Sequence, residues 1–201
     1  MKKACITLNL SIIIMEIVGF ILNFCESGRI AIEYYTEQSN ILALIASSVF
    51  LFFLLSKKPA PKWAIWLKYI ATLGLAVTFL VTITILGPMY DFKYDFLLFH
   101  NALLFQHTLC PILGVICFIF FDKSEKLKMK DVFASLAWTI FYAILMIILN
   151  IVGAISGPYP FLKVMEQPVL VSIMWVIVIL GMAFLLSSGI RWSKNKALDI
   201  H

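Results

Sequence analysis

Residues 169–190 read VLVSIMWVIVILGMAFLLSSGI, a run without a single charged side chain. An α-helix rises about 1.5 Å per residue, so this run is long enough to cross the roughly 30 Å hydrocarbon core of a bilayer. Five more apolar runs of similar length precede it, at residues 4–24, 35–55, 66–87, 97–121 and 132–153. Because an open sheet edge in lipid would leave backbone groups unpaired, we predict an all-α, polytopic membrane bundle of six transmembrane helices.

The composition and the loop lengths agree with a membrane bundle. Of the 201 residues, 62% are hydrophobic and 13% are charged, which is too apolar for a soluble core with a hydrated surface. The connections between the runs reach only about ten to fifteen residues, too few to fold independently. We therefore predict one domain over residues 1–201, in a multi-pass protein of the cell membrane, with a bacterial plasma membrane as the expected location.

The positive charges alternate between the two sides of this predicted bundle. Loops one, three and five contain only three of the 16 lysines and arginines, namely Arg29, Lys93 and Lys163. The other 13 are Lys2, Lys3, Lys57, Lys58, Lys62, Lys68, Lys123, Lys126, Lys128, Lys130, Arg191, Lys194 and Lys196. Because cytoplasmic loops are enriched in cations, we predict that both termini are cytoplasmic. The net charge of +5 is then explained by the orientation of the protein in the membrane and by attraction to lipid headgroups, and nucleic-acid binding is not expected.

Glu16 lies in the middle of the first apolar run. An ionisable side chain at the bilayer centre costs about 2.5–3.5 kcal/mol on insertion scales. We therefore predict that Glu16 faces the bundle interior and has a polar partner on another helix. Two interpretations stay open: a proton or ion site that can also orient a histidine, and a neutral, hydrogen-bonded packing residue.

The fourth run carries the polar residues His100, Asn101, Gln106 and His107, followed by Pro111. The two histidines are seven residues apart and therefore share one helical face, about two turns from each other. A transition-metal site needs further ligands, and no helical HxxxH or HxxEH pattern is present, so we expect neither a metal nor a cofactor. His107 is also compatible with a hydrogen-bonded interior histidine without chemistry.

The second run opens with five consecutive polar residues: Thr36, Glu37, Gln38, Ser39 and Asn40. Capping and the helix dipole account for one or two of them at a helix N-terminus. Their number, and a stripe that continues inward through Ala43 and Ser47, indicates a cavity wall or a close helix contact.

These features share the predicted outer side of the membrane. The second and fourth runs begin there, and the fifth ends there, before Gly157-Pro158-Tyr159-Pro160-Phe161. His107 is expected roughly 15 Å below the start of its helix, with Thr36 at a shallower depth. Direct contact between them requires a tilted helix or a deeper helix start.

At these residues the chain resembles the prokaryotic six-transmembrane family known as Pr6Pr. The resemblance rests on Tyr35-Thr36-Glu37-Gln38-Ser39-Asn40, on His107 with Pro111 four residues later, and on Tyr159-Pro160-Phe161-Leu162. It covers nearly the whole chain in order and spacing. That group is similar, more distantly, to the androgen-induced family of membrane threonine hydrolases, which cleave fatty acid esters of hydroxy fatty acids.

The resemblance implies that Thr36 is a nucleophile and His107 its general base. A threonine hydroxyl is a weak nucleophile, and a neutral imidazole can take its proton during attack on an ester carbonyl. Free N–H groups at the helix N-terminus, with Gln38 or Asn40, would stabilise the oxyanion. Further pocket candidates are Ser39, His100, Asn101, Tyr159 and Phe161. The expected partners are membrane lipids or fatty acyl esters.

Two other classes of function are compatible with the same residues. In a small transporter, Glu16, His100 and His107 would relay protons or bind a solute, although no repeat or paired broken-helix pattern supports this. In a lipid-binding or scaffold protein, the polar residues would only hold helices together.

Overall fold

The computed structural model describes residues 2–200, and every regular element in that range is helical. Six helical segments are long and apolar enough to cross a membrane: Lys2–Ser27, Tyr35–Leu55, Lys62–Met89, Asn101–Phe121, Met129–Ile151 and Val169–Asp199. The predicted all-α bundle with six membrane spans is confirmed. The side of the membrane on which each terminus lies stays a prediction.

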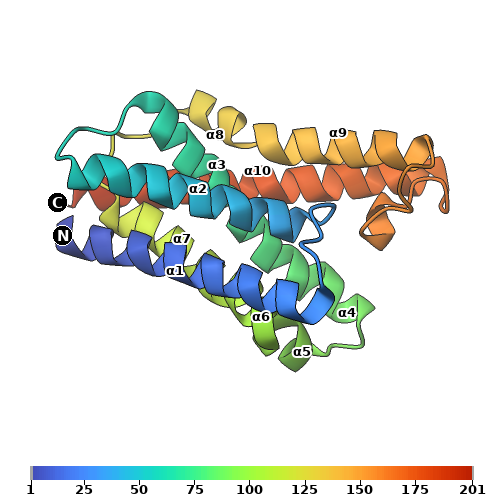
Figure 1. Ribbon diagram of the computed structural model, residues 1–201. Coiled ribbons are helices and arrows are strands. Elements are labelled where there is room, and N and C mark those ends of the chain that lie inside the picture. Colours follow the sequence, from blue (N-terminus) through green and yellow to red (C-terminus); the bar gives the residue numbers. More distant parts are fainter. Residues whose placement is uncertain (1, 201) are drawn as a thin grey trace.

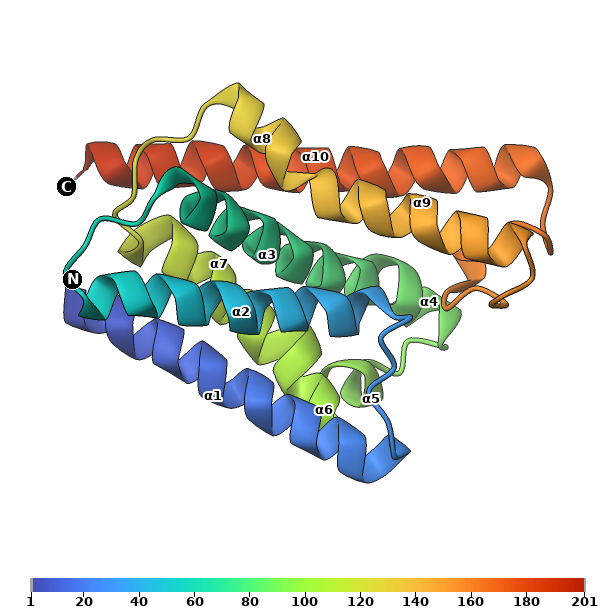
Figure 2. The ribbon, with the colours of Figure 1, turned by 45° about the horizontal axis from the view of Figure 1, so that its top comes forward.

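Several spans are built from more than one helical element. The elements are α1 (Lys2–Ser27), α2 (Tyr35–Leu55), α3 (Lys62–Val81), α4 (Gly87–Met89), α5 (Tyr94–Phe99), α6 (Asn101–Leu103), α7 (Cys110–Ile116), α8 (Met129–Ser135), α9 (Ala137–Ile151) and α10 (Val169–Asp199). Short π-helical stretches cover Thr82–Leu86, Leu104–Leu109 and Cys117–Phe121, and a 3-10 turn covers Pro160–Leu162. Both ends of the chain lie at one end of the bundle, as Figures 1 and 2 show.

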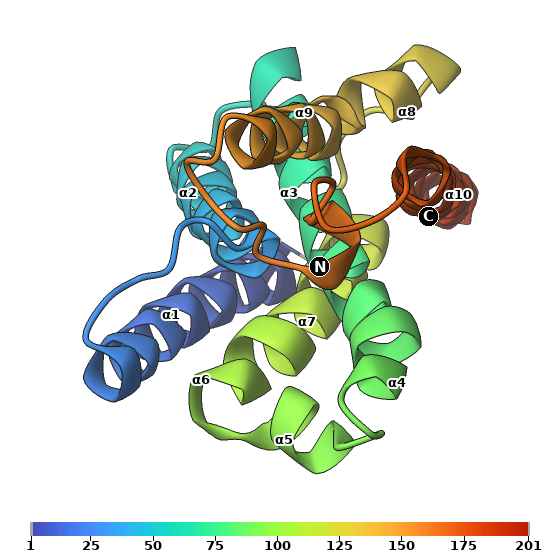
Figure 3. The same ribbon diagram turned by 90° about the vertical axis from the view of Figure 1, so that its right-hand side faces the viewer.

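Helix α3 forms the centre of the bundle. In an apolar 18-residue stretch of its span, 72% of the residues are buried inside the protein, whereas the corresponding share for α10 is 6%. Figure 3, a view along the bundle, shows α3 surrounded by the other long helices. Tyr69 of α3 stacks on Phe118 with ring centroids 5.3 Å apart, and both side chains are fully buried. Because α3 contacts neighbours on all sides, it has the broad apolar surface of an internal helix.

The fourth span differs from the predicted range 97–121. Helix α5 ends at Phe99, His100 has an extended backbone, and the span begins at Asn101 with a left-handed φ of 40°. Asparagine is one of the few residues that tolerate this conformation, because its short polar side chain can hydrogen-bond locally. The break shortens the predicted span by four residues, about 6 Å of helix rise, and so reduces the expected depth of His107 below its helix start.

Candidate functional site

Thr36 lies in the first turn of α2, at the end of the bundle opposite the termini. Its Oγ1 atom is 3.2 Å from Nε2 of His107, within hydrogen-bond distance. The two side chains are 9% and 6% exposed, so the pair is almost entirely removed from solvent. The structure thus brings together the two residues that the sequence singled out, and the fourth span begins later than predicted.

A hydrogen bond at Nδ1, the second ring nitrogen, orients the His107 ring. Nδ1 lies 2.7 Å from the backbone carbonyl oxygen of Leu97, which can only accept a hydrogen bond. Nδ1 must therefore carry the proton in a neutral ring, and the lone pair of Nε2 faces the Thr36 hydroxyl. Thr108 makes the equivalent bond to the Leu98 carbonyl at 2.7 Å. Both acceptors belong to the last turn of α5, where helix carbonyls have no intrahelical partner.

The helix around His107 is locally widened. Residues Leu104–Leu109 are π-helical, and Pro111 follows four residues after His107. Proline has no N–H to donate to the carbonyl four residues earlier, and its ring crowds that carbonyl, so the regular α-helical pattern cannot continue through this turn. Such π-helical turns are frequent at functional sites because they redirect side chains.

Tyr159 approaches the same pair from the loop between α9 and α10. Its hydroxyl oxygen accepts a hydrogen bond from the Thr36 backbone N–H at 3.5 Å, and its ring stacks on Phe161 with centroids 5.0 Å apart. Burial raises the pKa of Tyr159 to about 12. The phenol therefore keeps its proton near neutral pH and can donate it to an oxygen placed beside Thr36.

Two cavities meet at Thr36. The first, of about 260 Å³, is lined by Thr36, His107, Glu37, Asn23, Tyr34 and Tyr159, among others. The second is a narrow apolar cleft of about 50 Å³ whose lining includes Val81, Tyr142, Ile147, Phe161, Trp175 and Ile179. Thr36, Leu86 and Tyr159 belong to both linings. A molecule bound at Thr36 therefore has the polar side chains of Asn23, Glu37 and His107 in a mostly apolar cavity on one side, and an almost entirely apolar cleft on the other.

Three of the predicted pocket residues have structural contacts instead. Asn40 donates through Nδ2 to the backbone carbonyls of Thr36, at 2.7 Å, and Gln106, at 3.3 Å. Ser39 bonds to Thr78 of α3 at 2.9 Å, and Gln38 donates to the Ile32 carbonyl at 2.8 Å. None of the three lines either cavity, which corrects the expectation that they form the pocket. Asn40 instead links the backbones that carry Thr36 and His107.

His100 and Asn101 also lie outside the two cavities. Both side chains are exposed and contact Glu26 at the end of α1, each at 3.1 Å. The break at residue 100 rotates His100 away from the face that carries His107, so the seven-residue spacing no longer places them together. The expectation that these two residues belong to the pocket is therefore corrected.

Glu16 faces the bundle interior, with no exposed surface. Neither of its carboxyl oxygens has a hydrogen-bond partner among residues 2–200, although the Cys110 thiol of α7 lies beside it. Glu16 therefore has the expected interior position. Its polar neighbour is this thiol, which is a weak hydrogen-bond donor.

Two contributors to the site were not predicted from the sequence. The first is the Leu97 carbonyl, a backbone group that has no signature in the sequence. The second is Glu37, which lines the polar cavity next to Thr36 and accepts hydrogen bonds from Asn23 and Gln106. Its adjacency to Thr36 in an apolar span was the available signal, because a buried carboxylate at such a position needs partners. Within residues 2–200, no cluster of three His, Cys, Asp or Glu side chains can hold a metal.

Comparison with known proteins assigns no relative to this arrangement. No family model, no curated protein and no solved structure matches the chain. The resemblance to the six-transmembrane family stays a prediction.

Proposed function

We propose that this membrane protein is a threonine hydrolase that cleaves fatty acyl esters. The observation that carries the proposal is the 3.2 Å contact between Thr36 Oγ1 and His107 Nε2, with the ring held by the Leu97 carbonyl. A nucleophile, a base in hydrogen-bond reach and a third group that orients the base are the three parts required for acyl transfer. Here the orienting group is a backbone carbonyl in place of a carboxylate.

The reaction follows from this geometry in two halves. As Oγ1 of Thr36 bonds to the ester carbonyl carbon, its proton moves to Nε2 of His107. The tetrahedral intermediate then breaks the bond to the alcohol oxygen, which takes the proton from Nε2, and the acyl group stays on Thr36. Water next attacks the acyl carbon while His107 accepts its proton and returns it to Oγ1. The acid leaves and the starting state is restored.

Two donors are suited to the oxyanion of the intermediate. The hydroxyl of Tyr159 lies beside the Thr36 backbone and stays protonated near neutral pH. The Glu37 N–H is in the first turn of α2, where helix N–H groups have no intrahelical acceptor. Donors fixed in this way are effective because they need no reorganisation when the charge develops.

The two cavities support an amphipathic substrate. The apolar cleft, where Ile147, Trp175 and Ile179 contribute to the lining, offers an acyl chain an apolar surface that leads away from Thr36. The polar end of the substrate would then lie in the larger cavity beside Glu37 and Asn23. The ester bond between these two parts would lie at Thr36, which lines both cavities.

Labelling with a fluorophosphonate probe tests the proposal on the purified full chain. The probe should attach to the wild type at Thr36, with loss of fluoride, and Thr36→Ala and His107→Ala should each abolish labelling. Thr84→Ala and His100→Ala are matched controls, because Thr84 and His100 are exposed and lie outside both cavities. Both controls should label like the wild type.

Two outcomes would contradict the proposal. One is an absence of labelling and of ester hydrolysis in a wild-type sample whose helix content is intact. The other is labelling that persists in Thr36→Ala. Either result favours the reading in which the cavities bind lipid without chemistry. A proton relay receives less support, since His100 pairs with Glu26 and neither carboxyl oxygen of Glu16 accepts a hydrogen bond from a histidine.

A further inference from the structure

A third and larger cavity lies at the other end of the bundle, where the termini are. Its volume is about 700 Å³, within the range of pockets that hold small molecules. It is enclosed by the start of α1, the end of α2, the start of α3 and the segment that follows Phe121. Five lysines line it: Lys2, Lys57, Lys58, Lys62 and Lys123.

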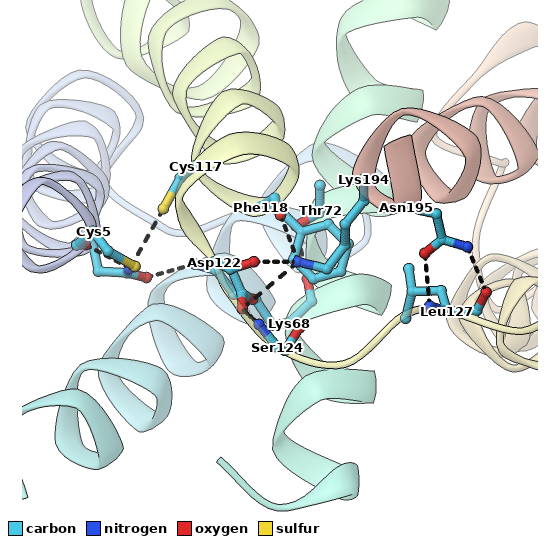
Figure 4. Close-up of polar contacts among 11 residues, drawn as sticks. Cys5, Lys68, Thr72, Cys117, Phe118, Asp122, Ser124, Leu127, Lys194 and Asn195 are labelled. Carbon is cyan, nitrogen blue, oxygen red and sulfur yellow. Dashed lines mark hydrogen bonds and ion pairs between the residues drawn. The ribbon is translucent and has the colours of Figure 1, made fainter. Parts of the chain in front are cut away.

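Only two acidic residues line this cavity, and both have cationic partners. Lys62 lies 2.6 Å from Glu125, so these two charges offset each other. Asp122 is buried beside the ammonium group of Lys194, at 3.7 Å, and Figure 4 shows this pair close to Ser124.

The remaining four lysines have no such compensation. Within residues 2–200, no carboxylate lies in ion-pair distance of Lys2, Lys57, Lys58 or Lys123. They come from two loops and from α1, so the fold gathers them from three separate segments. Four uncompensated cations around one concave surface attract an anion.

The cavity is apolar as well as cationic. Phe50, Phe53, Leu54, Ile65 and Phe121 also belong to its lining, all from the parts of the helices that enter the membrane. The lysines belong to loops and to helix starts. A phospholipid has the matching arrangement, with apolar acyl chains inside the membrane and a charged phosphate at its surface.

Two polar atoms of the lining, Oγ of Ser124 and Oδ2 of Asp122, are buried and have no hydrogen-bond partner among residues 2–200. The serine hydroxyl can donate to a phosphate oxygen, whereas the carboxylate oxygen can only accept. A headgroup that has hydroxyl groups in addition to a phosphate carries both the acceptor and the donor that these two atoms require. The glycerol headgroup of phosphatidylglycerol has this composition.

We propose that this cavity binds the phosphate headgroup of an anionic phospholipid, with phosphatidylglycerol as the fitting species. The cavity shares no lining residue with those at Thr36, so the proposal is independent of hydrolysis. The lysine-rich end is the predicted cytoplasmic side, where anionic lipids attract basic segments.

Native mass spectrometry of the full chain in a neutral detergent tests this binding. The chain is titrated with phosphatidylglycerol and, separately, with phosphatidylcholine, and the lipid-bound fraction is measured. The test variant is Lys57→Gln/Lys58→Gln/Lys123→Gln. The matched control, Lys3→Gln/Lys130→Gln/Lys196→Gln, removes the same charge from exposed lysines outside the cavity.

The wild type should bind phosphatidylglycerol in preference to phosphatidylcholine. The affinity of the test variant for phosphatidylglycerol should fall about tenfold or more, because each lysine near a lipid headgroup contributes to the binding free energy. The affinity of the control should change by less than about twofold. Equal losses in both variants would show diffuse charge attraction and overturn the proposal.

Two further arms identify the ligand. A photoactivatable phosphatidylglycerol should crosslink the wild type at Phe53 or Phe121, a readout that does not depend on how the variants fold. Crosslinks confined to other surfaces would overturn the site. Soluble glycerol 3-phosphate should not displace the lipid at equal concentration. Full displacement would mean that the cavity takes free phosphate esters, which also contradicts the lipid assignment.

Discussion

Replacing Glu16 by methionine is expected to stabilise the protein. The Glu16 side chain is fully buried, and within residues 2–200 its carboxyl oxygens have no hydrogen-bond partner and only the weakly donating Cys110 thiol beside them. An unsatisfied buried polar group costs about 1–3 kcal/mol even when it is neutral. Methionine has a similar length, favours helices and adapts to irregular gaps. The Glu16→Met variant should therefore gain about 1–3 kcal/mol in free energy of unfolding.

Thermal unfolding in detergent, followed with a thiol-reactive dye, measures this gain. Cys5, Cys110 and Cys117 are buried in the folded protein and become reactive when it unfolds. For a chain of this size, 1 kcal/mol corresponds to about 2–4 °C, so Tm should rise by about 2–12 °C. Glu26→Met is the matched control: Glu26 is an exposed carboxylate that accepts hydrogen bonds from Asn101 and His100, and its loss should bring no gain.

A fall in Tm for Glu16→Met would refute the reasoning. It would mean that Glu16 has a stabilising partner in the folded protein, such as a bound cation or an ordered water. That result would support the interpretation of Glu16 as an ion or proton site. The pH dependence of Tm, measured for the wild type and for the variant, would then distinguish an ion site from a proton site.

Three further predictions concern other parts of the molecule. Tyr159→Phe should lower the hydrolysis rate of a fatty acyl ester by about 10²–10³, and an unchanged rate would remove Tyr159 from the oxyanion site. Lys194→Leu should lower the free energy of unfolding, measured by thermal unfolding, by about 3–5 kcal/mol, because it leaves the buried Asp122 without its cationic partner. A decrease of less than about 1 kcal/mol would contradict this prediction. In intact cells, in a Cys25→Ser background that removes the exposed native thiol, a membrane-impermeant thiol reagent should label Lys93→Cys and not Lys126→Cys; the reverse pattern would contradict the predicted topology.

The helical spans were predictable because hydropathy acts over whole segments. The sixth run, residues 169–190, is found within α10, and the runs 4–24, 35–55 and 66–87 also fall within membrane-length helices. The run 132–153 extends two residues past the end of its span, and the run 97–121 begins four residues before its span. The break at His100 was not predictable in the same way. Phe96, Leu97, Leu98 and Phe99 are as apolar as the span that follows, so a hydropathy average runs through the interruption. The left-handed backbone of Asn101, which separates α5 from α6, is a local event that such an average cannot resolve.

The candidate site was predictable in part, for a related reason. Thr36 and His107 stood out because polar side chains at membrane depth are costly and therefore few. Asn40 stood out by the same criterion, but its amide bonds to two backbone carbonyls and does not face the cavity. Polarity in a span shows that a side chain needs a partner, and the direction of that partner is set by the packing of α2 against its neighbours.

The bond from His107 to the Leu97 carbonyl affects how this protein tolerates genetic change. A carboxylate in the orienting position would be lost by a single codon change. A main-chain oxygen is encoded by every residue type, so position 97 can drift among apolar residues of similar volume while the imidazole tautomer is preserved. This hydrogen bond is instead sensitive to changes in the length of the segment from Gly87 to Asn101. Insertion or deletion of one residue there would shift α5 against the fourth span and remove the carbonyl from Nδ1.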